Sequence, residues 1–326
     1  MDNIINFKQR EWIMCKTMER LAKSNKRSGI PILTTLACDK KKIMATDMDF
    51  WITAQSALKK GTYHAEGFSK GVQISAEYPT TDFPLPHKTG EKIGGVSLNK
   101  KHMDAIDWVS LAQSTEKTRY YLNGMYFGGN QIVATNGHML NCITIDQEII
   151  KDGGVIFPRT AWKYLMMLCK ELKDFDVEIE FYEKEKFKAT VGHCVMEGKL
   201  IDGTFPDWRS LVPDEFPEEN TTFFDVEEMK EIYKQVDVVR KIDKMKTPAI
   251  VFDGGFVTPA NSFYSVKNTL KWKVEANLTI QIGFNAKYVA NSCSGIMQYS
   301  DSTSPVLIRD DRRSIKKLSV LMPLSV

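Results

Sequence analysis

A short residue pattern occurs twice in this chain, and this repetition constrains the fold more than any other feature. The pattern is an apolar residue, any residue, Ala, Thr and then Asp or Asn, at 43–47 and at 132–136. Each copy ends a β-like run and leads into a second apolar stretch. A second pair of matched turns follows in the same order, at 81–84 and at 203–207. Ordered self-similarity of this kind predicts one structural unit that is used more than once.

The two copies differ in length, and the first is shorter between its landmarks by about one strand-helix-strand element. In the second copy this interval contains a helix predicted over 158–170, with Pro158 near its start, and a strand predicted over 177–181. No equivalent is visible between Gly61 and Asp82. The first unit is therefore expected to lack one helix.

A third unit of the same kind is expected from about Thr221 onward. Its elements are predicted at 221–224 (strand), 226–241 (helix), 249–252 (strand), 278–282 (strand) and 286–292 (short helix). The chain is thus predicted to be an α+β protein of three related domains, at 1–90, 91–213 and 214–326.

Composition excludes a disordered chain, because 43% of the residues are hydrophobic, which is enough to build cores. No apolar run approaches the roughly 20 residues of a membrane span, and no signal peptide is apparent, so we expect a cytoplasmic protein. The six cysteines are scattered without a Cys-x-x-Cys pair, which argues against disulfides and a structural metal site. We expect buried thiols, no metal and no cofactor.

The net charge of +3 does not indicate whether the protein binds a polyanion, so the local distribution of the basic residues has to be considered. On the helix predicted over 11–27, apolar residues gather on one side and basic residues on the other. Two further helices carry basic residues in one sector. A solvated charged face is the ordinary explanation of one such helix, but three largely single-signed faces favour a surface that binds phosphates. The residues are Lys16, Arg20, Lys23 and Arg27; Arg159, Lys163 and Lys170; and Lys230 and Lys234.

Two longer residue strings distinguish the second unit. Residues 119–127 read Arg-Tyr-Tyr-Leu-Asn-Gly-Met-Tyr-Phe, and residues 133–140 read Val-Ala-Thr-Asn-Gly-His-Met-Leu. Both resemble the bacterial DNA polymerase III β subunit, the sliding clamp. The similarity continues at 155–159, 199–209, 283–289 and 320–324. It covers the chain from about residue 93 to the end, and more weakly 27–33 and 45–47 in the first unit.

The resemblance implies a DNA clamp fold, with sheets outside and helices lining a central pore, and a head-to-tail homodimeric ring around double-stranded DNA. It places Arg27 at a DNA-contacting position of the family. Because one helix is expected to be absent, we predict five pore helices in each protomer instead of six. The chain would then be a non-catalytic processivity factor, with a DNA polymerase, a clamp loader and other proteins as partners.

The family also has a hydrophobic groove between its second and third domains, which receives short peptides of these partners. Apolar and Met side chains at a domain junction suit a site that adapts to several peptides, although they could equally form an inter-domain core. This chain has Met139 and Ser325 where family members commonly carry basic residues, so the groove rim is expected to differ. Carried over by motif position, the groove would consist of Leu122, Thr135, Gly137, His138, Met139, Leu140, Pro206, Leu211, Val320 and Met322.

Two other function classes are alternatives to a DNA-encircling clamp. One is a clamp-like interaction module that binds peptides but does not close around DNA. The other is an enzyme, suggested by the adjacent His193 and Cys194, but neighbours within the strand expected there would point to opposite faces. His138 has no acidic, Cys or His partner at a ligand spacing, and no phosphate-binding glycine loop occurs.

Overall fold

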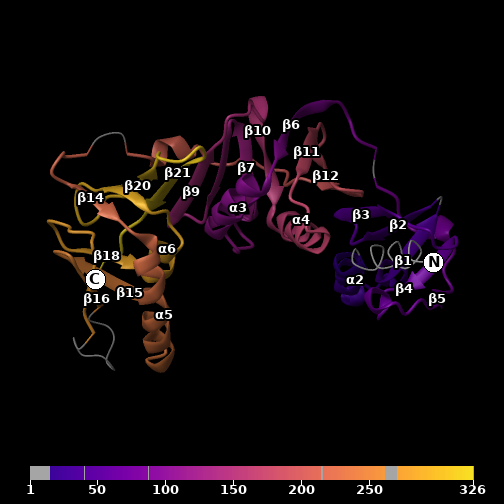
Figure 1. Cartoon of the computed structure of the whole chain (residues 1–326), viewed down its shortest axis with the longest axis horizontal. Coiled ribbons are helices and arrows are strands. Elements are labelled where there is room, and N and C mark those ends of the chain that lie inside the picture. Colours follow the sequence, from indigo (N-terminus) through magenta and orange to yellow (C-terminus); the bar gives the residue numbers. More distant parts are fainter. Residues whose placement is uncertain (1–14, 40, 87, 214–215, 261–269, 326) are drawn as a thin grey trace. The chain divides into compact units, whose positions relative to one another are not determined.

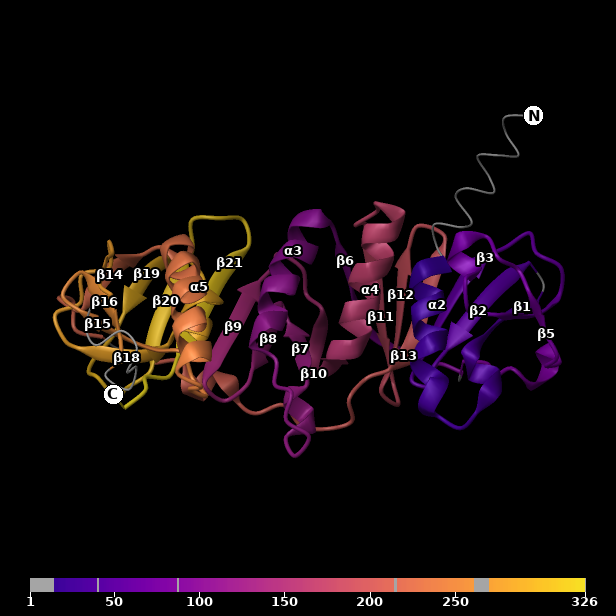
Figure 2. The ribbon, with the colours of Figure 1, turned by 90° about the horizontal axis from the view of Figure 1, so that it is seen from below.

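The computed structural model describes residues 15–39, 41–86, 88–213, 216–260 and 270–325. The chain divides into two compact units, each made of two stretches of sequence (Figures 1 and 2). Unit 1 comprises residues 1–104 and 149–202, and unit 2 comprises residues 105–148 and 203–326. The predicted three-domain division stays a prediction, because both units combine parts of neighbouring predicted domains.

Unit 1 is built on an antiparallel sheet of nine strands in the order β5-β4-β1-β2-β3-β13-β12-β11-β6. β3 and β13 join the first and second predicted domains, with Ile52 opposite Met196. Large side chains such as Trp51 and Phe187 are fully buried in this unit. The strands are β1 Thr35–Asp39, β2 Lys42–Thr46, β3 Phe50–Gln55, β4 Gly61–His64, β5 Ser75–Ala76, β6 Lys92–Leu98, β11 Val177–Tyr182, β12 Lys186–Val191 and β13 Cys194–Lys199.

Two helices pack against strands of unit 1 and contact each other. Helix α2 (Cys15–Ser24) continues into a 3-10 turn, η1 (Asn25–Arg27), so the prediction of a helix over 11–27 is confirmed for the described residues 15–27. Its positions 11–14 lie outside the described part. Helix α4 (Arg159–Leu172) follows strand β10 (Ile150–Pro158), with Pro158 directly before its first residue, as predicted.

The predicted absence of a second helix in the first domain agrees with the structure of the described residues. Between Gly61 and Asp82 the chain forms β4, the 3-10 turn η3 (Phe68–Lys70), β5 and the 3-10 turn η4 (Thr80–Asp82). Glu19 of α2 supports this replacement segment, since its carboxylate accepts hydrogen bonds from the backbone N–H groups of Gly67 at 3.4 Å and Ser69 at 2.9 Å. The carboxylate thereby satisfies two backbone donors of this segment.

The main sheet of unit 2 contains strands in the order β7-β8-β9-β21-β20-β19-β14, and a smaller sheet has the order β17-β16-β15-β18. β9 pairs with β21, which joins the second and third predicted domains. The strands are β7 Gly124–Gly129, β8 Gln131–Thr135, β9 Met139–Thr144, β14 Thr221–Phe224, β15 Ala249–Asp253, β16 Phe256–Pro259, β17 Trp272–Lys273, β18 Ile282–Asn285, β19 Gly295–Gln298, β20 Val306–Asp310 and β21 Lys316–Leu321.

The remaining helices are α3 (Lys100–Val109), α5 (Val226–Ile242) and α6 (Ala286–Ala290), so the described residues hold five α-helices. The predicted helices over 226–241 and 286–292 are confirmed. The predicted strand over 278–282 is wrong, because β18 begins only at Ile282. Its apolar Leu278 is buried without being part of a strand, so burial had been mistaken for strand periodicity.

The repeated pattern forms the same turn twice. Thr46 donates its hydroxyl proton to the carbonyl of Phe50 at 2.8 Å, and Thr135 does the same to Met139 at 2.8 Å. The Asp47 and Asn136 side chains each accept two backbone N–H bonds in the following residues. One local hydrogen-bond scheme therefore closes the β2–β3 and β8–β9 hairpins, which is why the sequence pattern recurs.

His193 and Cys194 do not lie within one continuous strand, so that expectation was wrong. β12 ends at Val191, Gly192 adopts a positive φ of 53°, and β13 begins at Cys194. The dipeptide lies at a hairpin turn, where the sulfur of Cys194 is buried and burial raises the pKa of its thiol to about 12. A thiol of this kind is a poor nucleophile.

The described part of the chain contains no helix that is long and apolar enough to cross a membrane. Within the same residues, no group of three or more His, Cys, Asp or Glu side chains could hold a metal ion. The five described cysteines with placed side chains are all buried, which agrees with the prediction of buried thiols for these residues. The side chain of Cys15 lies outside the described part.

Candidate nucleic-acid interface and peptide groove

The basic residues of α2 and α4 lie on two adjacent helices of unit 1. Arg20 of α2 reaches Met167 of α4, with 3.9 Å between its Nη1 and the sulfur. Lys16 and Arg20 are exposed on α2, and Lys163 and Lys170 are exposed on α4. We call these four residues together with Arg159 the basic face. None of the five forms a salt bridge with a described residue, so their charges remain available to an anionic partner.

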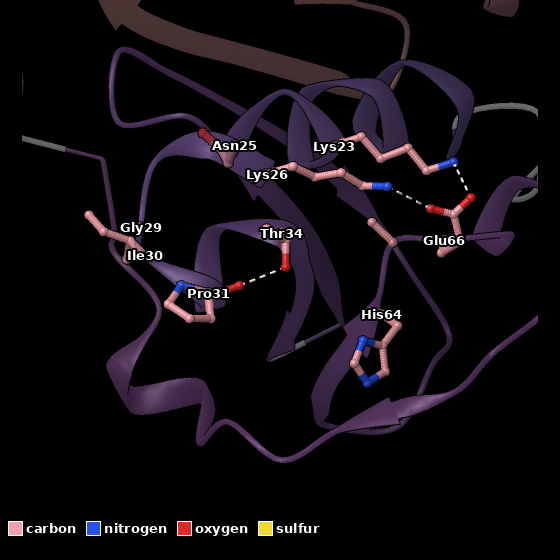
Figure 3. Close-up of a pocket in the computed structure, with 10 residues that line it drawn as sticks. Lys23, Asn25, Lys26, Gly29, Ile30, Pro31, Thr34, His64 and Glu66 are labelled. Atoms are coloured by element: carbon pink, nitrogen blue, oxygen red, sulfur yellow. Dashed lines mark hydrogen bonds and ion pairs between the residues drawn. The ribbon is translucent and has the colours of Figure 1, made fainter.

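Lys23 differs from this set, although the sequence predicted it on the same side of the helix. Its ammonium nitrogen lies 2.5 Å from a carboxylate oxygen of Glu19 and 2.9 Å from one of Glu66. Figure 3 shows Lys23 and Lys26 both directed at the carboxylate of Glu66. The hydrogen bonds that Lys23 donates to Glu19 and, secondarily, to Glu66 raise its pKa. The structure thus corrects the prediction that Lys23 belongs to a single-signed surface.

These ion pairs line a pocket of about 370 Å³, which also contains His64, Pro31 and Thr34 (Figure 3). The Thr34 hydroxyl donates to the carbonyl of Pro31 at 2.7 Å. Because the two lysines of the pocket are balanced by Glu19 and Glu66, the pocket presents no net positive charge to an anion. Arg27 lies nearby in η1, exposed and without a described ion-pair partner, so its charge stays available to an anionic partner.

The third predicted basic set is also corrected. On α5, Lys230 pairs with Glu227 at 2.6 Å and Lys234 pairs with Glu231 at 2.6 Å. The prediction treated this helix face as largely single-signed, but each lysine has an acid three residues before it. Pairs with i,i+3 spacing meet on one helix face and offset each other's charge. Both lysines are exposed, and their charges are locally compensated.

The predicted groove residues lie entirely within unit 2, and Met139, Leu140 and Val320 lie where β9 pairs with β21. Leu140 of β9 is opposite Val320 of β21. Beyond the strand end, Met322 donates its backbone N–H to the carbonyl of His138 at 2.9 Å, which holds the terminal segment against the β8–β9 turn. The His138 ring stacks on Tyr288 of α6, with 6.1 Å between centroids and 11° between planes. This arrangement joins the second and third predicted domains.

The ten predicted groove residues fall into two groups by exposure. Five are exposed and available to a ligand: Gly137, His138, Pro206, Leu211 and Met322. The other five are buried: Leu122, Thr135, Met139, Leu140 and Val320. Met139 is only 2% exposed, so the position where the family commonly has Arg carries a core side chain here.

A buried polar network fixes the strand pair beneath the groove. Asn141 of β9 donates to the carbonyls of Trp108 at 3.3 Å and Asn291 at 3.1 Å, and it accepts a hydrogen bond from the hydroxyl of Ser319 at 2.8 Å. The Ser319 oxygen in turn accepts from the N–H of Cys293 at 3.1 Å. Asn141 and Ser319 are 0% exposed, so a lost partner here would leave a buried polar group unsatisfied.

Arg119 and Tyr288 lie near the predicted groove but were not predicted as site residues, although both belong to stretches that carry the family resemblance. Arg119 packs on Gly137, where an added Cβ would come within 2.8 Å of its Nη1, and the positive φ of 89° also favours glycine there. Glu116 neutralises Arg119, with 2.8 Å between the charged groups. Burial, and secondarily the charge of Glu116, raises the pKa of Tyr288, which keeps this phenol protonated beside His138.

Comparison with known proteins points to one family. Residues 97–207 match the family model "DNA polymerase III beta subunit, central domain". The β sliding clamp of Caulobacter vibrioides is 29% identical over 274 residues, which span 76% of this chain and 70% of that protein. The crystal structure of the sliding clamp of Bartonella birtlesii superimposes with a TM-score of 0.76 at 26% identity and covers 97% of both chains. The chain belongs to the β sliding clamp family.

Further relatives show the same family and fold. The β sliding clamp of Rickettsia bellii is 29% identical over 272 residues, 76% of this chain and 71% of that protein. The Caulobacter crescentus clamp structure, at 23% identity, has a TM-score of 0.75 with 97% of both chains covered. The α+β architecture of this divergent clamp, with its mostly antiparallel sheets and few helices, is therefore that of the sliding clamps.

Proposed function

We propose that this sliding clamp closes around duplex DNA as a head-to-tail homodimer and confers processivity on a DNA polymerase that it holds through the groove of unit 2. The observation that carries the proposal is the basic face, whose exposed cations make no salt bridge with described residues. Lys and Arg contacts to phosphates position a protein on DNA but carry no sequence information. A protein held mainly by such contacts can move along the duplex.

The groove supports the tethering part of the proposal. Leu211 is 49% exposed and Met322 is 39% exposed, and Met322 lies beside His138, whose ring stacks on Tyr288. Flexible Met side chains can adapt to different apolar partners. We propose that short peptide segments of a polymerase, a clamp loader and other proteins bind here. The Bartonella birtlesii clamp was crystallised with griselimycin, which serves as a probe for ligand binding to this chain.

Neither role requires a chemical step. Cys194 beside His193 is buried, and no group of three or more His, Cys, Asp or Glu side chains among the described residues could hold a metal ion. We therefore assign no reaction centre to these residues. We propose that the protein is a non-catalytic subunit that functions without a cofactor.

Topology provides the direct test of encirclement. Protein diluted to its monomeric form is mixed with a nicked circular plasmid and concentrated, so that protomers can associate around the DNA. The complex is then passed over a sizing column in high salt, which removes contacts made only through phosphates. We expect retention on the circle and loss after one restriction cut. Equal retention on cut and uncut DNA would contradict encirclement.

A second candidate function is a peptide-binding module that does not close a ring. The shortened first domain and the ion-paired lysines of α5 favour it, because a ring would then present fewer helices and fewer uncompensated positive charges to DNA. Light scattering across a dilution series separates the candidates. A dimer that persists on dilution supports the ring. A monomer at every concentration, with griselimycin still bound, would support the module.

A further inference from the structure

One acidic side chain lies within the otherwise basic α2–α4 surface. The carboxylate oxygen Oε2 of Glu171, near the end of α4, accepts two hydrogen bonds from Thr17 in the first described turn of α2. The backbone N–H of Thr17 donates at 3.1 Å and its hydroxyl at 2.6 Å. Thr17 is 0% exposed, so both donors depend on this partner. The two residues are 154 positions apart in the sequence.

A carboxylate at this position carries two energetic penalties. Burial raises the pKa of Glu171, while the bonds from Thr17 and the charges of Lys16 and Arg20 act in the opposite direction. A negative charge beside cations that would meet phosphates also repels the DNA. A neutral residue would avoid both penalties, so the position calls for a compensating role.

We propose that Glu171 is a positioning residue that fixes α2 against α4, so that Lys16 and Arg20 form one phosphate-binding surface with Lys163 and Lys170. The inference rests on the proposed DNA-binding function. Among the described residues, two other polar contacts link the helices: Arg20 reaches the Met167 sulfur, a weak acceptor, at 3.9 Å, and Ser24 at the end of α2 forms a side-chain hydrogen bond with Tyr164 of α4. Glu171, which accepts two bonds from Thr17, provides the polar link at the end of α2 that carries Lys16.

Two substitutions separate positioning from charge. Glu171→Gln removes the negative charge but keeps an oxygen that can accept both bonds from Thr17. Glu171→Ala removes the charge and the acceptor together. Glu178→Ala is the matched control, because Glu178 is an exposed acid of β11 in the same unit with no described partner.

The assay is binding of the full chain to a fluorescent 30-bp duplex over a range of salt concentrations. For Glu171→Gln we expect equal or tighter binding and an unchanged slope of log K against log salt. For Glu171→Ala we expect weaker binding and a slope shallower by up to about 2, since two cations leave the surface at about 0.9 each. A loss of folded protein lowers the amplitude but not the slope. If Ala and Gln tighten binding equally, Glu171 acts only as a charge and the proposal is wrong.

Hydrogen exchange of residues 15–24 tests the link without DNA. Exchange should accelerate in Glu171→Ala and remain as in the wild type in Glu171→Gln and Glu178→Ala. Unchanged exchange in Glu171→Ala would refute the positioning role. If the wild type does not bind DNA at all, the proposed function fails, while the exchange data still decide whether Glu171 holds the helices together.

Discussion

The ion pairs of the helices predict which lysines matter for DNA. We compare Lys163→Gln/Lys170→Gln on α4 with Lys230→Gln/Lys234→Gln on α5. Each double variant removes two positive charges per protomer from exposed helix positions, and Gln has nearly the helix propensity of Lys. The pairs differ because only the α5 lysines are held by acids, both at 2.6 Å.

The expected magnitude follows from the release of counterions. Each phosphate contact contributes about 0.9 to the slope of log K against log salt, so losing two contacts makes the slope shallower by about 1.8 for each protomer on the DNA. Between 50 and 200 mM salt this amounts to about a tenfold smaller loss of affinity. For the α5 variant we expect a much smaller change of slope, because its lysines already have carboxylate partners that must be displaced before they meet a phosphate.

The measurement is fluorescence anisotropy of a labelled 30-bp duplex at five salt concentrations, with dimer formation checked for each variant by light scattering. Griselimycin binding serves as the control, since the groove lies in unit 2 and α4 in unit 1. If both double variants change the slope equally, net charge and not the pairing state governs binding, and our distinction between free and paired lysines is refuted.

Three further predictions test other parts of the structure. Burial alone would raise the pKa of Glu19, but bonds from Lys23 and Ser69 outweigh it and lower the value from 4.5 to about 2. Glu19→Gln should therefore cost on the order of 2 kcal/mol in urea unfolding at pH 7, and the difference should shrink as pH falls below 4.5; a pH-independent difference would contradict this. Met322→Asp should weaken griselimycin binding at least tenfold, while Met48→Asp, a matched control because Met48 is a similarly exposed methionine of unit 1, should leave it unchanged. Burial raises the pKa of Cys142 and Cys169 to about 12, so mass-spectrometric mapping should find these thiols unlabelled by iodoacetamide until the protein is unfolded.

The elements with local causes could be predicted from sequence. The Ala-Thr-Asx turns recur because their hydrogen bonds close within five residues, so the same letters produce the same hairpin. Helices α4 and α5 follow from apolar periodicity and from Pro158 at the start of α4. The strand expected over 278–282 failed, because a short apolar run does not distinguish a strand from a buried loop.

The charge state of the basic helices was predicted less well, for two different reasons. The acids three residues before Lys230 and Lys234 are visible in the sequence, so these ion pairs could have been predicted from it. The pairing of Lys26 with Glu66 was not visible, because 40 residues separate them and only the fold brings them together.

The sequence by itself determined the family, the repeated turns and the helices that carry the basic residues, since these depend on motifs and on periodicity along a short stretch. Only the tertiary structure decided which cations are free, where Glu171 meets Thr17, and that Leu140 and Val320 face each other beneath the groove. Such contacts join residues far apart in the chain. Their existence depends on how whole sheets and helices pack, which no local pattern encodes.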